Sequence, residues 1–134
     1  GNHAKIFSSF RRRLTENAEW NNRRDDVRLA LSMSIKMADI SNCGRPNSLY
    51  VEWAKNIALE FYNQGDVESK LKLPISPFMD RRKDKSDFPK GQTSFMNYIV
   101  MPMLEAIAEL LPAMEFAVQH CNENKDYWQK QTEQ

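Results

Sequence analysis

Apolar residues recur at intervals of three and four along most of the chain, which is the spacing of one buried face of an α-helix. Ile6, Phe7, Phe10 and Leu14 follow this spacing and predict a helix that begins near Ala4. Because the same spacing returns in later segments, the pattern predicts an all-α fold in the form of a helical bundle.

The second predicted helix, which follows Asn21 and Asn22 and runs to about Ala38, is ambiguous by period alone. Between Leu29 and Met37, large apolar residues alternate with small or polar ones, as in a half-buried strand. We favour a helix because the segment is long and rich in Ala, Leu, Met and Lys. Asn21 and Asn22 precede it as candidate capping residues, and two aspartates occupy its first turn.

The third predicted helix has the clearest pattern, because Leu49, Trp53, Ile57 and Phe61 fall every four residues. It follows the turn-forming residues 42–47. We expect it to end at Gly65, where glycine can take the left-handed conformation that closes a helix.

The C-terminal half of the sequence predicts a long ordered loop and two further helices. The loop spans residues 74–91, which contain three prolines and a block of mixed charge. A helix then begins at Gln92 and is bent or broken at Pro102, because proline lacks a backbone donor. The last helix runs from Pro112 toward Asn122, and a polar tail follows.

Composition limits the functions that this chain can have. With 134 residues, 41% hydrophobic residues and a net charge of +1, the chain is one domain or part of one. Its basic residues are cancelled by nearby acids, so no nucleic-acid surface is expected. No apolar run approaches the ~20 residues of a membrane span, and no signal peptide is evident. Cys43 and Cys121 predict free thiols and a cytoplasmic location.

Two polar residues stand out from the apolar pattern. Asp39 ends the segment Met37–Ile40, where an ionised carboxylate would be costly to bury without a cationic partner. Physical chemistry alone favours a cap or a salt bridge over a metal ligand by about two to one. Gln92 opens an apolar helix, where an amide is more often a cap than a recognition group. The two histidines, His3 and His120, lack partners at metal-ligand or general-base spacing.

Several motifs in register nevertheless resemble one family, the class I cyclic nucleotide phosphodiesterases. The resemblance extends from about His3 to Trp128. It is carried by KMADISN at residues 36–42, Trp53, EFYNQGD at 60–66, ISPFMD at 75–80, QTSF at 92–95 and YIV at 98–100.

The resemblance implies that residues 1–134 are the C-terminal portion of an all-helical catalytic domain. The N-terminal half, with the histidine metal ligands and the proton donor, is absent, so no catalytic residue lies in this chain and we expect it to be inactive alone. In the family, an inner zinc and an outer magnesium or manganese polarise the cyclic phosphate and activate a water that opens the 3′ ester. Asp39 matches the carboxylate of the inner metal site.

The resemblance also implies a nucleotide pocket. Gln92 matches the glutamine that hydrogen-bonds the purine, Phe95 would stack on the base, and Ile57 would close the opposite side. Without the resemblance, core packing is favoured by about four to one for each of the residues spaced along the third helix, and by about two to one for Phe95. The remaining pocket residues that the resemblance implies are Asn42, Tyr50, Trp53, Ala54, Phe61 and Phe78.

Two functions remain open at this point. The first is hydrolysis of cAMP, cGMP or both, with the rest of the catalytic domain and a cyclic nucleotide as partners. The alternative is a non-catalytic helical module that binds a nucleotide or a protein. Cys43 and Met37 depart from the usual family residues near Asp39, although neither removes a ligand. A homodimer is left open by the sequence.

Overall fold

The computed structural model describes residues 2–16, 19–20, 23–82 and 88–132, and within these residues every regular element is helical. The predicted all-α fold is therefore confirmed. The elements are α1 (Asn2–Thr15), α2 (Arg24–Asp39), η1 (Ser41–Gly44), α3 (Asn47–Lys70), η2 (Pro77–Met79), α4 (Phe88–Phe95), the π-helical turn η3 (Met96–Val100), α5 (Met101–Leu110), η4 (Pro112–Met114) and α6 (Glu115–Thr132).

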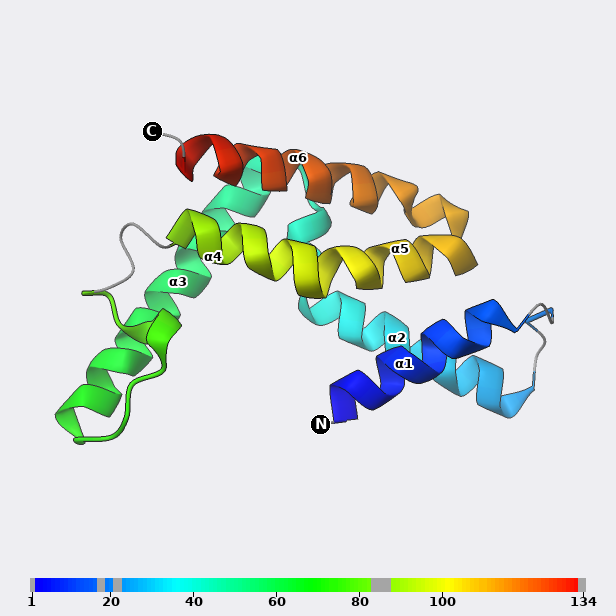
Figure 1. Cartoon of the computed structure of the whole chain (residues 1–134), viewed down its shortest axis with the longest axis horizontal. Helices are drawn as coiled ribbons and strands as arrows, with labels where there is room; N and C mark the ends of the chain where they lie inside the picture. The colour runs from blue at the N-terminus through cyan, green and yellow to red at the C-terminus, as the bar shows by residue number, and fades with distance from the viewer. Residues whose placement is uncertain (1, 17–18, 21–22, 83–87, 133–134) are drawn as a thin grey trace.

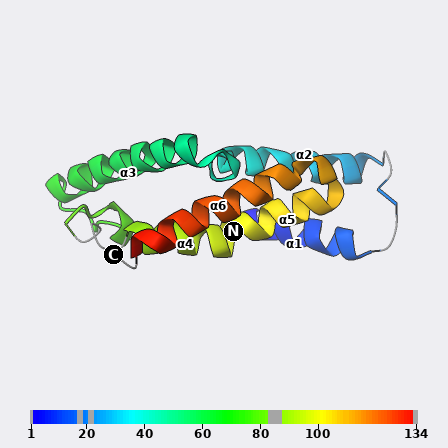
Figure 2. The same ribbon diagram turned by 90° about the horizontal axis from the view of Figure 1, so that it is seen from above.

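The helices form an arch rather than a closed bundle (Figure 1). Helix α6 packs along the rod made by α4, η3 and α5, while α1 and α2 pair beneath α5. One arm of the arch is formed by α1 and α2, and the other is formed by α3, which extends away from α6. Figure 2 shows α2 and α3 following one another on one side of the molecule, with α4, α5 and α6 on the other. No helix among the described residues is long and apolar enough to cross a membrane.

Helix α2 has two apolar faces, which explains the alternating pattern in its sequence. Met33 and Met37 are buried against the rest of the chain. Leu31 and Ile35 lie on another face and are 59% and 67% exposed. The alternation thus arises because apolar residues occupy both sides of one helix, and the predicted helix is confirmed. Its N-cap is Arg23, whereas the predicted caps lie outside the described residues.

Helix α3 continues to Lys70, so the prediction that it ends at Gly65 is wrong. Gly65 is buried inside the helix and does not adopt a positive φ. A Cβ atom built on Gly65 would overlap the backbone carbonyl of Met79. The glycine is therefore explained by the close approach of η2 to α3 rather than by helix termination.

The actual end of α3 is closed by Lys72, which has a φ of 58°. The amide of Leu73 donates to the carbonyl of Glu68 at 2.9 Å, and the amide of Lys72 donates to Ser69 at 3.0 Å. This pair of bonds forms a Schellman motif, in which a glycine normally occupies the left-handed position.

The following helices also differ from the sequence prediction. Helix α4 begins at Phe88, four residues before Gln92, and residues 83–87 of the predicted loop lie outside the described residues. The helical path is not broken at Pro102, because α5 follows the π-helical turn η3 directly. Instead, the amide of Met101 donates to the carbonyl of Met96, five residues earlier, and Pro102 falls in the first turn of α5, where no amide donor is required.

Helix α6 extends to Thr132, so the predicted polar tail after Asn122 is wrong. Ala117, Cys121, Asn124 and Trp128 are all buried along one face of the helix. Their spacing of four, three and four residues continues the helical stripe beyond the expected end, although one member is polar.

Both cysteines are free, as the sequence predicts, and both are buried. Burial raises the pKa of Cys43 to about 12, with a further contribution from the nearby Cys121. Burial also raises the pKa of Cys121 to about 11. Both side chains therefore remain neutral core residues at physiological pH.

Asn124 ties α6 to the turn between α2 and α3. Its side chain is fully buried, and its Nδ2 donates to the carbonyl oxygens of Cys43 and Arg45 at 2.9 Å each. Its Oδ1 accepts a bond from Asn47 Nδ2 at 3.1 Å. Gly44 allows the same close approach, because a Cβ there would lie 2.9 Å from the Cβ of Ala117.

We expect Asn124→Ala to lower the free energy of unfolding by about 2 to 3 kcal/mol, because it removes three hydrogen bonds and withdraws a donor from two carbonyl groups. Thermal and urea unfolding measure the change. Gln129→Ala, at an exposed position of the same helix, is the control and should cost less than about 0.5 kcal/mol. Equal effects of the two substitutions would contradict the role given to Asn124.

We expect Lys72→Gly to raise the free energy of unfolding by about 0.5 to 1 kcal/mol, because glycine relieves the left-handed strain at this position. Lys70→Gly, two residues earlier and inside the last helical turn, should instead lower it by a similar amount. Urea unfolding of both variants tests the prediction, which fails if the two changes have the same sign.

Candidate functional site

Three buried or half-buried polar groups from different helices form one hydrogen-bond chain beside the candidate pocket. The Trp128 indole Nε1 donates to the Tyr50 hydroxyl at 2.8 Å, and this hydroxyl donates to Gln92 Oε1 at 2.7 Å. Tyr50 lies on α3, Gln92 on α4 and Trp128 on α6. The predicted purine-binding residue is therefore tied to two other helices.

The donor and acceptor chemistry of Trp128, Tyr50 and Gln92 fixes the direction of each hydrogen bond. An indole nitrogen can only donate, so the Tyr50 oxygen accepts from Trp128 and has its single proton left for the Gln92 oxygen. If the amide were turned over, its NH₂ group would face Tyr50 and the hydroxyl proton would lose its acceptor. Burial raises the pKa of Tyr50 well above its usual range, so the hydroxyl keeps this proton. The Gln92 amide is consequently oriented with its oxygen toward Tyr50.

The aromatic ring of Trp128 is held as firmly as its nitrogen. Phe88 and Tyr127 pack edge-on against it, with ring centroids 5.2 and 4.9 Å away. Trp128 is not among the site residues predicted from the sequence. The helical spacing from Cys121 and Asn124 to Trp128 was the signal that this residue is buried.

The predicted pocket residues of α3 differ in exposure. Trp53 is 52% exposed and Ile57 is half-buried, whereas Tyr50 and Ala54 are buried. The two buried residues thus lie behind the surface that a ligand would meet. Phe95, on α4 one turn after Gln92, is 38% exposed.

A second aromatic pair joins α3 to η2. The rings of Phe61 and Phe78 lie edge to face, with centroids 5.6 Å apart and an interplanar angle of 69°. Phe78 is still 55% exposed. The structure therefore brings Gln92 together with Tyr50, and Phe61 together with Phe78.

Asp39 lies at the C-terminal end of α2 and is exposed, so the expectation that it is buried is wrong. It follows Leu31 and Ile35 at intervals of four residues, which places it on the open face of the helix rather than beside Met37. Asn42, in the next turn, is half-buried. The carboxylate is thus accessible to a ligand or to another segment.

Metal binding by this chain alone is not supported by the described residues. They contain no group of three or more His, Cys, Asp or Glu side chains arranged to hold a metal ion. Asp39 is an oxygen donor of the type that Mg²⁺ and Zn²⁺ accept, but only as one ligand among several.

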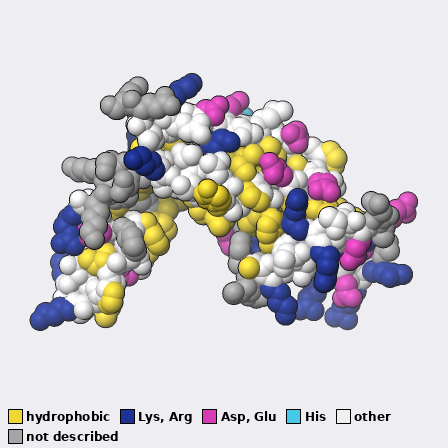
Figure 3. All heavy atoms as spheres, viewed as in Figure 1, with side chains coloured by type: hydrophobic (Ala, Val, Ile, Leu, Met, Phe, Trp, Pro, Cys, Tyr) yellow, Lys and Arg dark blue, Asp and Glu magenta, His cyan; other side chains and the backbone are white. Residues whose placement is uncertain are grey.

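An open surface lies along α2, ends one helical turn before Asp39, and includes none of the predicted site residues. A hollow follows the exposed face of α2 and is lined by Val27, Leu31 and Ile35 with three polar neighbours. Figure 3 shows the surface hollowed between the two arms of the arch, with hydrophobic side chains on the α3 arm. The exposed stripe of α2 and the exposed apolar side chains of α3 therefore have no covering element among the described residues.

Comparison with known proteins identifies the family. The model of the 3′5′-cyclic nucleotide phosphodiesterases matches residues 1–121, which is most of the chain. The chain belongs to this phosphodiesterase family.

Individual phosphodiesterases agree with this assignment. The chain is 38% identical over 109 residues to the dual 3′,5′-cyclic-AMP and -GMP phosphodiesterase beta of Plasmodium falciparum (isolate 3D7), an alignment covering 81% of this chain and 10% of that relative. It is 39% identical over 100 residues to the cGMP-specific 3′,5′-cGMP phosphodiesterase 3 of Dictyostelium discoideum, covering 75% of this chain and 21% of the relative.

A solved phosphodiesterase structure has the same fold. The structure of LmjPDEB1 in complex with IBMX matches with a TM-score of 0.87 and 28% identity, over 96% of this chain and 38% of that one. The chain therefore spans only a part of the phosphodiesterases that it resembles.

Proposed function

We propose that residues 1–134 are the C-terminal portion of a phosphodiesterase catalytic domain that hydrolyses 3′,5′-cyclic nucleotides to 5′-monophosphates. The substrate is cAMP, cGMP or both. The observation that carries this proposal is the pair of hydrogen bonds that orients the Gln92 amide. The protein in which it occurs belongs to the phosphodiesterase family.

In this proposal, Gln92 reads the edge of the purine. With its oxygen held by Tyr50, the amide offers its NH₂ donors and its second oxygen lone pair to a ligand. Adenine and guanine each present a matching donor and acceptor on one edge. Phe95 and Ile57 would hold the two faces of the base, and both side chains retain exposed surface that a base can contact.

The rest of the pocket is formed by residues that support or extend these contacts. Tyr50 and Ala54 back the pocket from the core, and Asn42 borders it at η1. Trp53, Phe61 and Phe78 supply its exposed apolar wall.

Asp39 is the residue of this chain that would ligate metal. Its carboxylate is exposed at a helix end, and the other ligands and the proton donor would come from the remainder of the domain. We assign it to an inner zinc site, with magnesium or manganese in the outer site. Divalent ions of this kind polarise a phosphoryl oxygen and lower the pKa of a bound water. Because one carboxylate does not hold two such ions, the chain alone is inactive.

The remainder of the domain would also cover the open apolar faces. Val27, Leu31 and Ile35 form a stripe on α2 that leads directly to Asp39. Packing against this stripe would bring the other ligands to the carboxylate and bury the apolar surface at the same time. A cytoplasmic location remains part of this proposal, and a homodimer is left open.

We expect Asp39→Ala in the complete protein to reduce metal-dependent hydrolysis of cAMP and cGMP by at least about 100-fold, because the inner site loses an anionic ligand. Steady-state assays with added Zn²⁺, Mg²⁺ or Mn²⁺ measure the loss, and bound zinc should fall in parallel. Asp25→Ala, an exposed aspartate in the first turn of the same helix, is the matched control.

Two results would contradict this function. Hydrolysis that survives Asp39→Ala would remove the proposed metal role of this residue. A complete wild-type protein that binds cyclic nucleotides without hydrolysing them would favour the non-catalytic module instead.

A further inference from the structure

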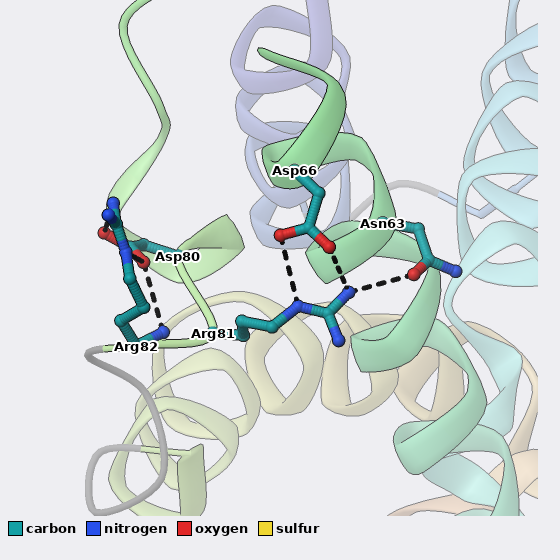
Figure 4. A network of polar contacts seen from close by, with 5 residues as sticks. All are labelled: Asn63, Asp66, Asp80, Arg81 and Arg82. Atoms are coloured by element: carbon teal, nitrogen blue, oxygen red, sulfur yellow. Dashed lines mark hydrogen bonds and ion pairs between the residues drawn. The ribbon is translucent and has the colours of Figure 1, made fainter. Parts of the chain in front are cut away.

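The segment after α3 folds back onto the helix, and Arg81 of this segment binds polar side chains of α3 (Figure 4). The Arg81 guanidinium contacts both oxygens of Asp66, with Nη2 to Oδ2 at 2.7 Å and Nε to Oδ1 at 3.2 Å. The same Nη2 donates to Asn63 Oδ1 at 2.9 Å. The guanidinium carbon also lies 5.7 Å from the centre of the Tyr62 ring. Three residues thus fix the Arg81 side chain, and its contact with Asp66 is bidentate.

The backbone around Arg81 is fixed by two further features. Gly65 lets the Met79 carbonyl approach α3 more closely than any other residue would allow. Asp80 is buried and accepts bonds from the Arg82 amide at 3.1 Å and from the Arg82 side chain at 2.8 and 3.0 Å. Residues 79–82 are therefore held in a defined turn against the helix, as Figure 4 shows for the polar contacts.

This turn lies next to the proposed pocket wall. Phe78 directly precedes Met79, and its ring packs against Phe61, which lies one helical turn before Gly65 on α3. The aromatic pair and the Arg81 contacts therefore occupy neighbouring turns of the same helix. A movement of residues 79–82 away from α3 would carry Phe78 with it.

We propose that Arg81, through Asp66 and Asn63, is a positioning residue that holds Phe78 in place as a wall of the nucleotide pocket. This inference rests on the proposed function, because Phe78 meets a nucleotide only if that pocket forms. A wall that is ordered before binding spares the ligand the entropic cost of ordering it. The effect should appear in KM rather than kcat, because Arg81 contacts neither the metal ligand Asp39 nor the purine amide.

The test uses the complete protein with Arg81→Gln, which keeps a long polar side chain but removes the positive charge and the paired guanidinium donors. We expect KM for the better cyclic nucleotide to rise about threefold to tenfold, with kcat changed less than about twofold. Hydrogen exchange of the Met79 amide, which donates to Ser76, should become faster. Arg12→Gln, at an exposed position on α1, is the matched control and should change neither quantity.

A double-mutant cycle separates positioning from a general loss of stability. In a Phe78→Ala background, Arg81→Gln should no longer raise KM, because the wall that it positions has been removed. Exchanging the charges, with Arg81→Asp and Asp66→Arg in one protein, should recover part of the lost affinity.

Three results would overturn the inference: an unchanged KM in Arg81→Gln, an unchanged Met79 exchange rate, or the same rise in KM with and without Phe78. The two KM results require an active wild-type protein, whereas the exchange rate does not. An inactive wild-type protein would refute the proposed function itself, so the two failures are distinguishable.

Discussion

A hydroxyl group held between an indole donor and an amide acceptor has only one arrangement that satisfies all three groups. This constraint orients Gln92, because Trp128 can only donate and Tyr50 has a single proton to pass on. The hydrogen bonds are shielded from water by burial of Tyr50 and Trp128. The proposed recognition of a purine depends on this orientation, since a freely rotating amide would present either polarity to the ligand.

Helix α6 supports both ends of the candidate site from two positions one turn apart. Asn124 donates to the carbonyl oxygens of Cys43 in η1 and of Arg45 just after it, and Trp128 donates to the Tyr50 hydroxyl that holds Gln92. Both residues lie beyond residue 121, where the match to the family model ends. The last turns of α6 therefore support the turn that follows Asp39 through Asn124, and they orient the Gln92 amide through Trp128 and Tyr50.

Periodicity predicted the helices because apolar residues recur at helical spacing, but it did not tell which face is buried. The periodic residues Leu49, Trp53 and Phe61 of α3 are exposed, and α4 has no buried residue. Periodicity also failed where a polar or glycine contact decided the outcome. Gly65 indicated a helix end from sequence, whereas the structure uses it for close contact with Met79. Asn124 is buried through hydrogen bonds that no periodic pattern of apolar residues contains. The exposure of Asp39 was missed because α2 carries apolar residues on two faces, and sequence alone does not say which face this chain covers.

The most direct test of this account is the coupling between Tyr50 and Gln92. In the complete protein, Tyr50→Phe removes only the hydroxyl that orients the amide, and we expect it to weaken binding of the preferred cyclic nucleotide by about 1 to 2 kcal/mol. Combined with Gln92→Ala, the same substitution should have almost no further effect, giving a coupling energy of about 1 kcal/mol or more. Equal losses in the two backgrounds would show that Tyr50 does not act through Gln92 and would contradict the account.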